Sequence, residues 1–158
     1  MFIFKQIGII RSPHIEADNT PIQPVYAEKF SAEIEIFPDF VEGLKDIEGF
    51  SHIYLLYFFH RVISFKLIVK PFLEDVEHGI FATRASLRPN PIGMSIVRLI
   101  KRNGNILHVC GADMLNDTPL LDIKPYIEFF DKIDATKNGW MDRIDKEKAK
   151  KIGSRNRE

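Results

Sequence analysis

Alternating apolar and polar residues dominate the first two-thirds of the chain. In the segment 30–37, apolar side chains stand at every second position, with Ser31, Glu33 and Glu35 between them. This period of two predicts a strand with one buried face. The segment 2–11 is rich in Ile and Phe and predicts an earlier strand, which stops at the Ser-Pro pair that follows it.

Five more strands are expected farther along the chain. The segment 52–60 is apolar on both faces, as in a strand buried on two sides, although a helical segment of this length would give the same pattern. The segments 94–102 and 105–112 flank Asn103-Gly104, and an Asn-Gly link between β-rich runs is a strong hairpin signal. Shorter apolar runs predict the last two strands, at 65–69 and 120–124.

Helical signals are short and confined to two places. The segment 38–49 predicts a short helix, limited by its two glycines. After Pro125 the pattern turns helical, with inner positions at Trp140, Ile144, Ala149 and Ile152. Because strands do not alternate with long helices, the pattern argues against a doubly wound parallel sheet. We expect a mainly β fold, a single antiparallel β-barrel domain with short helices over residues 1–135, followed by a C-terminal helical and basic element over 136–158.

Charge and composition narrow the class of protein. The 158 residues carry 22 basic and 22 acidic side chains, and zero net charge argues against nucleic-acid binding by bulk electrostatics. The segment 141–158 is locally basic, with seven basic and four acidic residues. It is interpreted as a solvated helix end or, alternatively, as a contact for phosphate.

Several kinds of site are not expected. Cys110 is the only cysteine, so neither a disulfide framework nor a thiolate metal site is predicted. His52 and His60 share strand parity, but no known metal-ligand spacing accompanies them, and we expect no metal. The start of the chain does not resemble a signal peptide, and the apolar run 53–59 is too short to span a bilayer. These features predict a soluble, cytoplasmic protein without a membrane partner.

Two polar segments carry candidate chemistry. In the segment 79–93, Arg84 and Arg88 precede Pro-Asn-Pro, which stiffens the loop, so either arginine is a candidate for binding a carboxylate or phosphate. A structural turn whose arginines pair with nearby acids is the alternative. On the predicted strand 120–124, Asp122 and Lys124 point to one face that is otherwise inward-looking, which is typical of an internal ion pair. A role in binding ribose hydroxyls or an amine is the second interpretation.

Four motifs in order resemble the TsaA-like family, the tRNA N6-threonylcarbamoyladenosine methyltransferases. The motifs are Ile7-Gly8-Ile9-Ile10-Arg11-Ser12-Pro13; Gly49-Phe50-Ser51-His52 through Phe59-His60; Phe81-Ala82-Thr83-Arg84 through Arg88-Pro89-Asn90-Pro91-Ile92-Gly93; and Thr118-Pro119 through Asp122-Ile123-Lys124-Pro125-Tyr126. The resemblance covers about Ile7 to Asp131, and the order and spacing of the motifs make it specific.

The resemblance implies a homodimeric barrel that binds S-adenosylmethionine near the subunit interface and methylates tRNA beside the anticodon. Carried over to this chain, the contacts to the methyl donor are Gln23, Pro24, Val25, His60, Val62, Ile63, Arg84, Met94, Leu121, Asp122, Ile123 and Lys124. The loop containing Gln23 is only loosely similar. Longer members also continue into a C-terminal domain thought to help hold tRNA, which leaves tRNA recognition by this chain to its basic tail or to another mode.

A mechanism follows from the chemistry of the implied substrate. Its N6 atom is a poor nucleophile because its lone pair is delocalised, so catalysis needs positioning and a proton acceptor. The hypothesis places Asp122, tuned by Lys124, nearest the reacting centre, with Asn90 and Tyr126 orienting the base. Arg84 or Arg88 would hold a carboxylate of the donor or of the substrate. Aromatic side chains on which anticodon bases could stack are Tyr26, Tyr126 and Phe129.

Two other functions remain open from the sequence. The first is an enzyme of the same fold that methylates another RNA position or a small molecule. The second is a dimeric adaptor that binds S-adenosylmethionine or a nucleotide without catalysis. Donor binding and methyl transfer to tRNA distinguish these possibilities.

Overall fold

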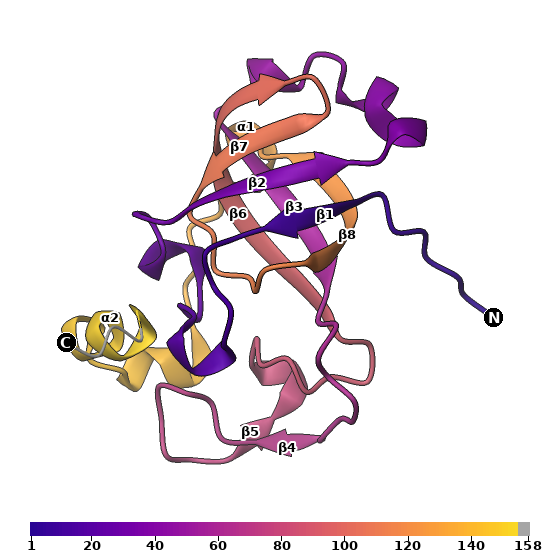
Figure 1. Ribbon diagram of the computed structural model, residues 1–158. Coiled ribbons are helices and arrows are strands. Elements are labelled where there is room, and N and C mark those ends of the chain that lie inside the picture. The colour runs from indigo at the N-terminus through magenta and orange to yellow at the C-terminus, as the bar shows by residue number, and fades with distance from the viewer. Residues whose placement is uncertain (155–158) are drawn as a thin grey trace.

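Six antiparallel strands close into a barrel in the computed structural model, which describes residues 1–154 (Figure 1). Around the barrel the strands follow the order β1-β2-β7-β6-β3-β8. Their bounds are β1 Gly8–Arg11, β2 Ser31–Ile36, β3 His52–Phe58, β6 Ile92–Asn103, β7 Ile106–Cys110 and β8 Thr118–Pro125. The prediction of a mainly β, antiparallel barrel is therefore confirmed.

The alternating pattern of the sequence sets the inside of the barrel. On β2, Ala32, Ile34 and Ile36 are buried while Ser31 and Glu33 are exposed. β3 is a strand, as predicted, and its inward residues are buried whereas the other face is only partly covered. The largest fully buried side chains of the barrel core are Ile10, Ile34, Ile36, Ile53, Leu55, Leu107 and Leu120. Burial of this apolar area is the main stabilising contribution to the barrel.

The β6–β7 hairpin forms as predicted, but its turn is shifted by one residue. Asn103 pairs with Ile106, so the two-residue loop is Gly104-Asn105. Gly104 has φ +63°, whereas Asn105 does not have a positive φ. A type II′ turn has this arrangement, with glycine at its first central position.

Two predicted strands are shorter than expected. The strand predicted over 2–11 begins only at Gly8, and the apolar side chains of Phe2, Ile3 and Phe4 are exposed. Nothing in residues 1–154 covers them, so their apolar character alone did not produce a strand. Of the segment 65–69, only β4 (Ile68–Val69) is extended, and it pairs with β5 (His78–Gly79) outside the barrel.

A β-bulge in β8 changes which way its polar residues point. Tyr57 pairs with Leu120 and Leu56 with Asp122, so Leu121 is the extra residue. Each residue inserted by a bulge shifts the following side chains to the opposite face. The expectation that Asp122 and Lys124 lie on an inward-looking face is therefore wrong, because beyond the bulge they point outward.

Short helices lie in the connections between the strands and after the last strand. The 3₁₀ segments are η1 Ala17–Asn19, η2 Pro24–Tyr26, η3 Pro38–Leu44, η4 Ile47–Gly49, η5 Ile80–Ala82 and η6 Gly139–Arg143. The α-helices are α1 Glu128–Asp131 and α2 Lys146–Ser154. The predicted helix over 38–49 is thus replaced by two separate 3₁₀ segments, η3 and η4. No helix among residues 1–154 combines the length and apolar character that a membrane crossing needs.

The C-terminal segment packs against loops of the barrel. The Trp140 indole donates to the carbonyl of Ala82 at 2.8 Å and stacks on His78. Ala149 is 3% exposed, as its predicted inner position requires. Gly153 lies against the ring of Tyr26, where a Cβ atom would be 2.5 Å from ring carbons. Arg155 and Arg157 of the predicted basic tail lie outside the described residues.

Candidate functional site

Three long loops meet at one end of the barrel. Because the strands run antiparallel, the connections 12–30, 59–91 and 111–117 all emerge at the ends of β1, β3 and β7. Figure 1 shows these segments below the barrel, together with β4 and β5. The predicted site residues before Met94 come from these loops, whereas those after it come from β8 and from Tyr126, which directly follows β8. This loop end is the first part of the candidate site.

Arg84 joins two of the loops. It is exposed, and its Nη1 donates to Oε1 of Gln23 at 2.7 Å. Gln23 immediately precedes η2, and Pro24 lies 3.9 Å from the position that a Cβ atom at Gly111 would occupy. The structure therefore brings together the 59–91 loop, which contains Arg84, the 12–30 loop, which contains Gln23, and the start of the 111–117 loop.

Arg88 has a structural role in the same loop. Its Nη1 donates to the carbonyls of Ile80, Thr83 and Ala85 at 3.1, 2.8 and 3.3 Å. Its guanidinium also lies 5.8 Å from the centre of the Phe81 ring. Of the two arginines, Arg84 has the more available charge, because Arg88 holds the loop in shape. Asn90 is exposed beyond it, and its carbonyl accepts from the amide of Ile92.

A buried chain of hydroxyl groups ends on a carboxyl group at this end of the barrel. The Tyr57 hydroxyl and Ser95 Oγ are 2.9 Å apart, and Ser95 donates to Oδ1 of Asp113 at 2.6 Å. Burial raises the pKa of Asp113 to about 7, although the Ser95 hydroxyl and the Arg84 charge favour the ionised form. Burial also raises the pKa of Tyr57.

The sequence pattern did not predict this chain of hydrogen bonds from Tyr57 through Ser95 to Asp113. Ser95 and Asp113 are 18 positions apart, on β6 and in the loop after β7. The available signal was Ser95 itself, a polar residue at an inward position of an otherwise apolar strand. Such a residue needs a hydrogen-bonding partner.

The second part of the candidate site lies on the outer face of β8, β3 and β6. The strand register aligns Asp122 with Leu56 and Leu56 with Met94. Adjacent strands are about 4.8 Å apart, so Asp122 and Met94 lie roughly 10 Å apart across β3. Lys124 forms an ion pair with Oδ2 of Asp122 at 3.1 Å, and the amide of Ile123 donates to Oδ1 at 2.9 Å. The predicted ion pair is thus present, on the outside of the barrel.

Aromatic residues continue this outer face beyond Lys124. The half-buried ring of Tyr126 lies 5.8 Å from that of Tyr54 and 6.3 Å from that of His52. Phe129 follows on α1 and is 91% exposed. Two of the three predicted stacking residues, Tyr126 and Phe129, therefore lie at this end of β8, whereas Tyr26 packs against α2 at the other end of the barrel.

The residues that follow β3 complete the set of predicted donor contacts. His60 is partly buried, and its pKa is lowered by burial and by the neighbouring Arg61. The amide of Val62 donates to the carbonyl of Phe59, and the side chain of Ile63 is 98% exposed. Among residues 1–154, no three His, Cys, Asp or Glu side chains are arranged to hold a metal ion.

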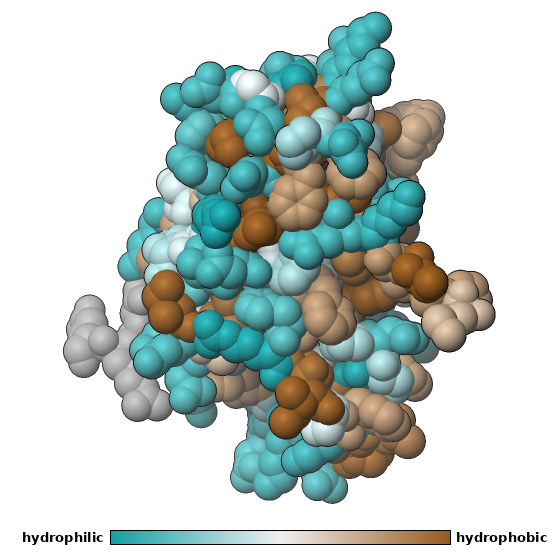
Figure 2. Space-filling view, turned by 45° about the vertical axis from the view of Figure 1, so that its right-hand side comes forward, coloured by the Kyte–Doolittle hydropathy of each residue, from teal (hydrophilic) through white to brown (hydrophobic). Residues whose placement is uncertain are grey.

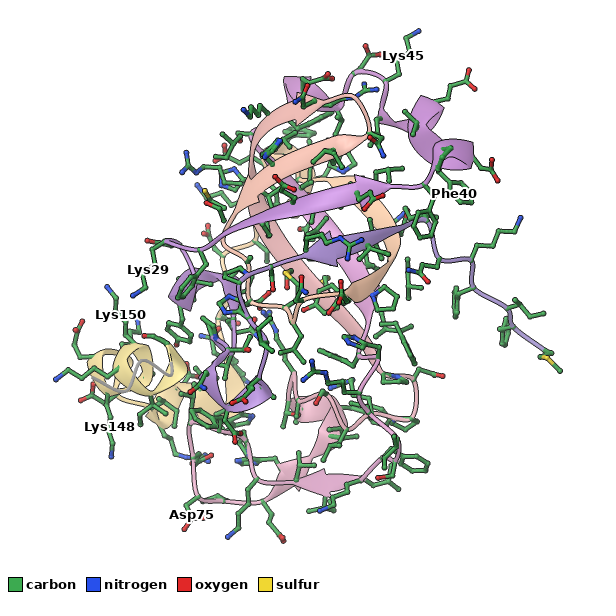
Figure 3. All side chains as sticks on the ribbon, viewed as in Figure 1. Lys29, Phe40, Lys45, Asp75, Lys148 and Lys150 are labelled. Carbon is green, nitrogen blue, oxygen red and sulfur yellow. The ribbon has the colours of Figure 1, made fainter. Side chains whose placement is uncertain are left out.

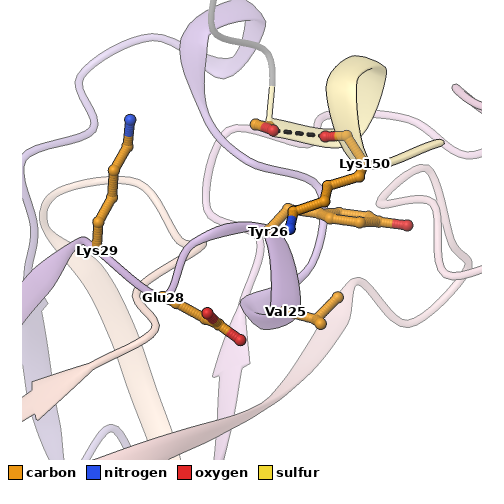
Figure 4. Close-up of a pocket in the computed structure, with 6 residues that line it drawn as sticks. Val25, Tyr26, Glu28, Lys29 and Lys150 are labelled. Atoms are coloured by element: carbon orange, nitrogen blue, oxygen red, sulfur yellow. Dashed lines mark hydrogen bonds between the residues drawn. The ribbon is translucent and has the colours of Figure 1, made fainter. Parts of the chain in front are cut away.

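A shallow hollow lies beside α2, away from most of the predicted residues. It is lined by Val25, Tyr26, Glu28, Lys29, Lys150 and Ser154 (Figure 4). Lys29, Lys148 and Lys150 reach outward on the side of the molecule where α2 lies (Figure 3). Val25 is the one predicted donor contact among the lining residues, so this hollow is not the place where the predicted residues meet.

Apolar side chains are exposed around the candidate site. On the outer face of β3 and β6, Phe58, Met94 and Ile96 are 38%, 49% and 38% exposed. Figure 2 shows more hydrophobic side chains at the lower end of the molecule, over the 59–91 segment, where Phe65 and Leu67 are exposed. Contiguous exposed apolar surface of this kind marks interaction sites.

Comparison with known proteins places the chain in context. Residues 9–132 match the model of the tRNA-methyltransferase O N-terminal domain. A probable S-adenosyl-L-methionine-binding protein of Pyrococcus abyssi is 50% identical over 143 residues, which are 90% of this chain and 78% of that protein. The tRNA (adenine(37)-N6)-methyltransferase of Escherichia coli is 34% identical over 142 residues, which are 84% of this chain and 60% of that enzyme.

A solved structure has the same architecture. The crystal structure of TrmO superimposes with a TM-score of 0.75 at 40% sequence identity. The match covers 88% of this chain and 64% of the TrmO chain. The chain thus spans less than two-thirds of the length of the Escherichia coli enzyme and of the TrmO chain.

Proposed function

The chain belongs to the family of the tRNA-methyltransferase O N-terminal domain, and on this premise we propose that it transfers a methyl group from S-adenosylmethionine to N6 of an adenosine in tRNA. The observation that carries the proposal is the family match over residues 9–132, which includes all of the barrel except its first residue, Gly8. Relatives named as S-adenosylmethionine-binding proteins and as tRNA (adenine(37)-N6)-methyltransferases support it. A cytoplasmic location accords with a tRNA substrate.

The residues of the candidate site suit a donor with an amino-acid end and a nucleoside. The guanidinium of Arg84 is hydrogen-bonded to the neutral amide of Gln23, which leaves its charge available for a carboxylate. Met94 and Leu56 offer apolar surface beside Asp122. When bound, S-adenosylmethionine would supply an electrophilic methyl group. The proposed contacts are Gln23, Pro24, Val25, His60, Val62, Ile63, Arg84, Met94, Leu121, Asp122, Ile123 and Lys124.

Asp122 is the proposed proton acceptor. Lys124 and the amide of Ile123 both contact its carboxylate and hold it in place on the outer face of β8. Tyr126 lies on the same strand face and would orient the target base. Asn90 was predicted to share this role, but it precedes β6 at the loop end, whereas Tyr126 lies beside His52 at the opposite end of β3, so the two do not meet within one protomer. A positioned acceptor contributes about 10²–10⁴-fold to a rate.

A finer proposal concerns the substrate. We infer that the methylated base is N6-threonylcarbamoyladenosine, whose carboxylate and exposed position beside the anticodon suit a site with basic and aromatic residues. Lys124 and Tyr126 follow one another along the outer face, and the exposed Phe129 comes next on α1, which supports this proposal. An exposed loop base can be splayed out and stacked on such rings.

We also propose that the protein acts as a homodimer. Phe58, Met94 and Ile96 expose apolar surface on adjacent strands, and a second copy of this face would cover it. The donor contacts Met94 and Asp122 lie on the same face, which would place the donor near the subunit interface. Residues 136–158 are proposed to be an appendage to the catalytic barrel of residues 1–135.

Mass spectrometry of nucleosides tests the proposed function. Unmodified and threonylcarbamoylated tRNA would be incubated with the protein and with S-adenosylmethionine labelled at the methyl group. We expect one labelled methyl group on threonylcarbamoyladenosine. Label on another nucleoside would assign a different RNA substrate, and donor binding without any transfer would favour the adaptor.

A further inference from the structure

Two side chains of opposite charge at the loop end are each held by a neutral partner. Nη1 of Arg84 donates to the amide oxygen of Gln23 at 2.7 Å. Oδ1 of Asp113 accepts from the hydroxyl of Ser95 at 2.6 Å. Within residues 1–154, neither Arg84 nor Asp113 has an ion-pair partner within 4.0 Å. They are nevertheless close enough for the Arg84 charge to favour ionisation of Asp113.

Asp113 occupies a place where a carboxyl group is difficult to keep charged. Burial raises its pKa to about 7, and a desolvated carboxylate is stable only when a cation or several donors surround it. The Ser95 hydroxyl, which is itself bonded to Tyr57, holds Oδ1 of the carboxyl group, and the backbone amide of Asp113 also donates to this group. Among residues 1–154, Ser95 is the one side chain that donates a hydrogen bond to it. This carboxyl group is therefore positioned to accept a cationic hydrogen-bond donor.

We propose that Asp113 binds the ammonium group, and Arg84 the carboxylate, of the amino-acid end of the methyl donor. The ammonium and carboxylate groups of an amino acid are attached to the same carbon. Asp113 and Arg84 are close to each other but form no ion pair, so each can bind the group of opposite charge. The inference rests on the proposed function and adds Asp113, with Ser95 as its positioning residue, to the donor site. The threonyl group of the proposed substrate has a carboxylate but no ammonium, so it does not satisfy Asp113.

The assignment gives donor binding a defined pH dependence. A carboxyl group with a raised pKa is neutral below about pH 7 and binds an ammonium best when ionised. Affinity should therefore rise between pH 5.5 and 7.5. The groups that face Asp113 are Arg84 from the 59–91 loop, Tyr57 from β3 and Ser95 from β6, and His14 is hydrogen-bonded to the adjacent carbonyl of Ala112. Because His14 also titrates, the pH effect must be compared with that of a variant lacking the carboxyl group.

Calorimetry with two nucleosides tests the inference. S-adenosylhomocysteine carries the amino-acid end, whereas 5′-methylthioadenosine has the same nucleoside and sulfur without it. We expect Asp113→Asn to weaken binding of S-adenosylhomocysteine about tenfold or more, the effect of losing one charge-assisted hydrogen bond, and to leave 5′-methylthioadenosine unchanged. Asp75→Asn, which removes an exposed carboxylate, is the matched control and should change neither affinity.

The pH profile provides a readout that a structural role would not change. Binding of S-adenosylhomocysteine should strengthen with pH in the wild type and in Asp75→Asn, and should lose this dependence in Asp113→Asn. Ser95→Ala keeps the carboxyl group but removes a hydrogen bond that favours its charge, so the midpoint of the profile should move to higher pH.

Several results would overturn the inference. Equal losses of affinity for both nucleosides in Asp113→Asn would mean that Asp113 only shapes the site. An unshifted midpoint in Ser95→Ala would contradict the assignment even if Asp113→Asn failed to fold. Absence of binding of either nucleoside to the wild type would remove the proposed function together with this inference, an outcome distinct from the first two.

Discussion

Single residues at the loop end are constrained by very close packing. Gly93, at the start of β6, lies under the ring of Tyr57, and a Cβ atom there would be 2.2 Å from Cε2 of the ring. The Tyr57 hydroxyl is in turn bonded to Ser95. A larger residue at position 93 would therefore displace the ring and the hydroxyl chain that leads to Asp113.

Gly93→Ala should destabilise the protein through this contact. Overpacking of a core typically costs about 1–3 kcal/mol, and here the ring has little room to move. Gly79→Ala is the matched control, because no atom lies within 4 Å of a Cβ at that position. Urea unfolding of both variants measures the difference. Equal stabilities would contradict the packing described for Tyr57.

A substitution of Asp122 tests its proposed role as the proton acceptor. Asp122→Asn should lower the methyl-transfer rate about 10²-fold or more, because the amide cannot accept the proton. Donor affinity should change much less, since the main-chain contacts of β8 remain. Single-turnover kinetics beside calorimetry separates the two effects, and a rate near that of the wild type would rule out Asp122 as the acceptor.

At the scale of elements, simple alternation made the strands predictable, whereas irregular positions were not. β2 follows from periodicity and the β6–β7 hairpin from the Asn-Gly signal, whereas β3 was predicted from a continuous apolar run that a helix would also allow. The bulge at Leu121 has no local signature, because it depends on how β8 pairs with β3. For the same reason the Asp122–Lys124 pair was predicted correctly but placed on the wrong side of the barrel.

The hydroxyl chain could not be predicted for a related reason. It joins β3, β6 and the loop after β7, and such contacts depend on barrel closure rather than on local sequence. Arg84 and Arg88 looked equivalent in the sequence. Only the folded loop distinguishes an arginine that binds three carbonyls of the loop from one that reaches across to Gln23.

The hairpin turn offers an element-level test. Gly104 has φ +63° and open space around it, so replacement by alanine introduces backbone strain without a clash. Gly104→Ala should therefore lower the free energy of unfolding by about 1 kcal/mol. Thermal or urea unfolding measures the change. An unchanged or increased stability would contradict the left-handed conformation at this turn.

At the scale of the whole molecule, the outer face of β3 and β6 exposes apolar side chains, and we propose that this face is the interface of a homodimer. Ile96→Glu should convert the dimer to a monomer, because the charge would have to be buried at the interface without a partner. Val76→Glu, at an exposed apolar residue of the 59–91 segment, is the control and should leave the assembly intact. Sedimentation analysis distinguishes the two states. A wild-type protein that sediments as a monomer would contradict the proposed assembly.

The proposed function and the proposed role of Asp113 both depend on where the methyl donor binds. A crystal structure of the protein with S-adenosylhomocysteine measures this directly. We predict the nucleoside beside Met94 and the main chain of residues 121–124, with its amino-acid end between Arg84 and Asp113. A ligand bound instead in the hollow between η2 and α2, or out of reach of both Arg84 and Met94, would contradict the account.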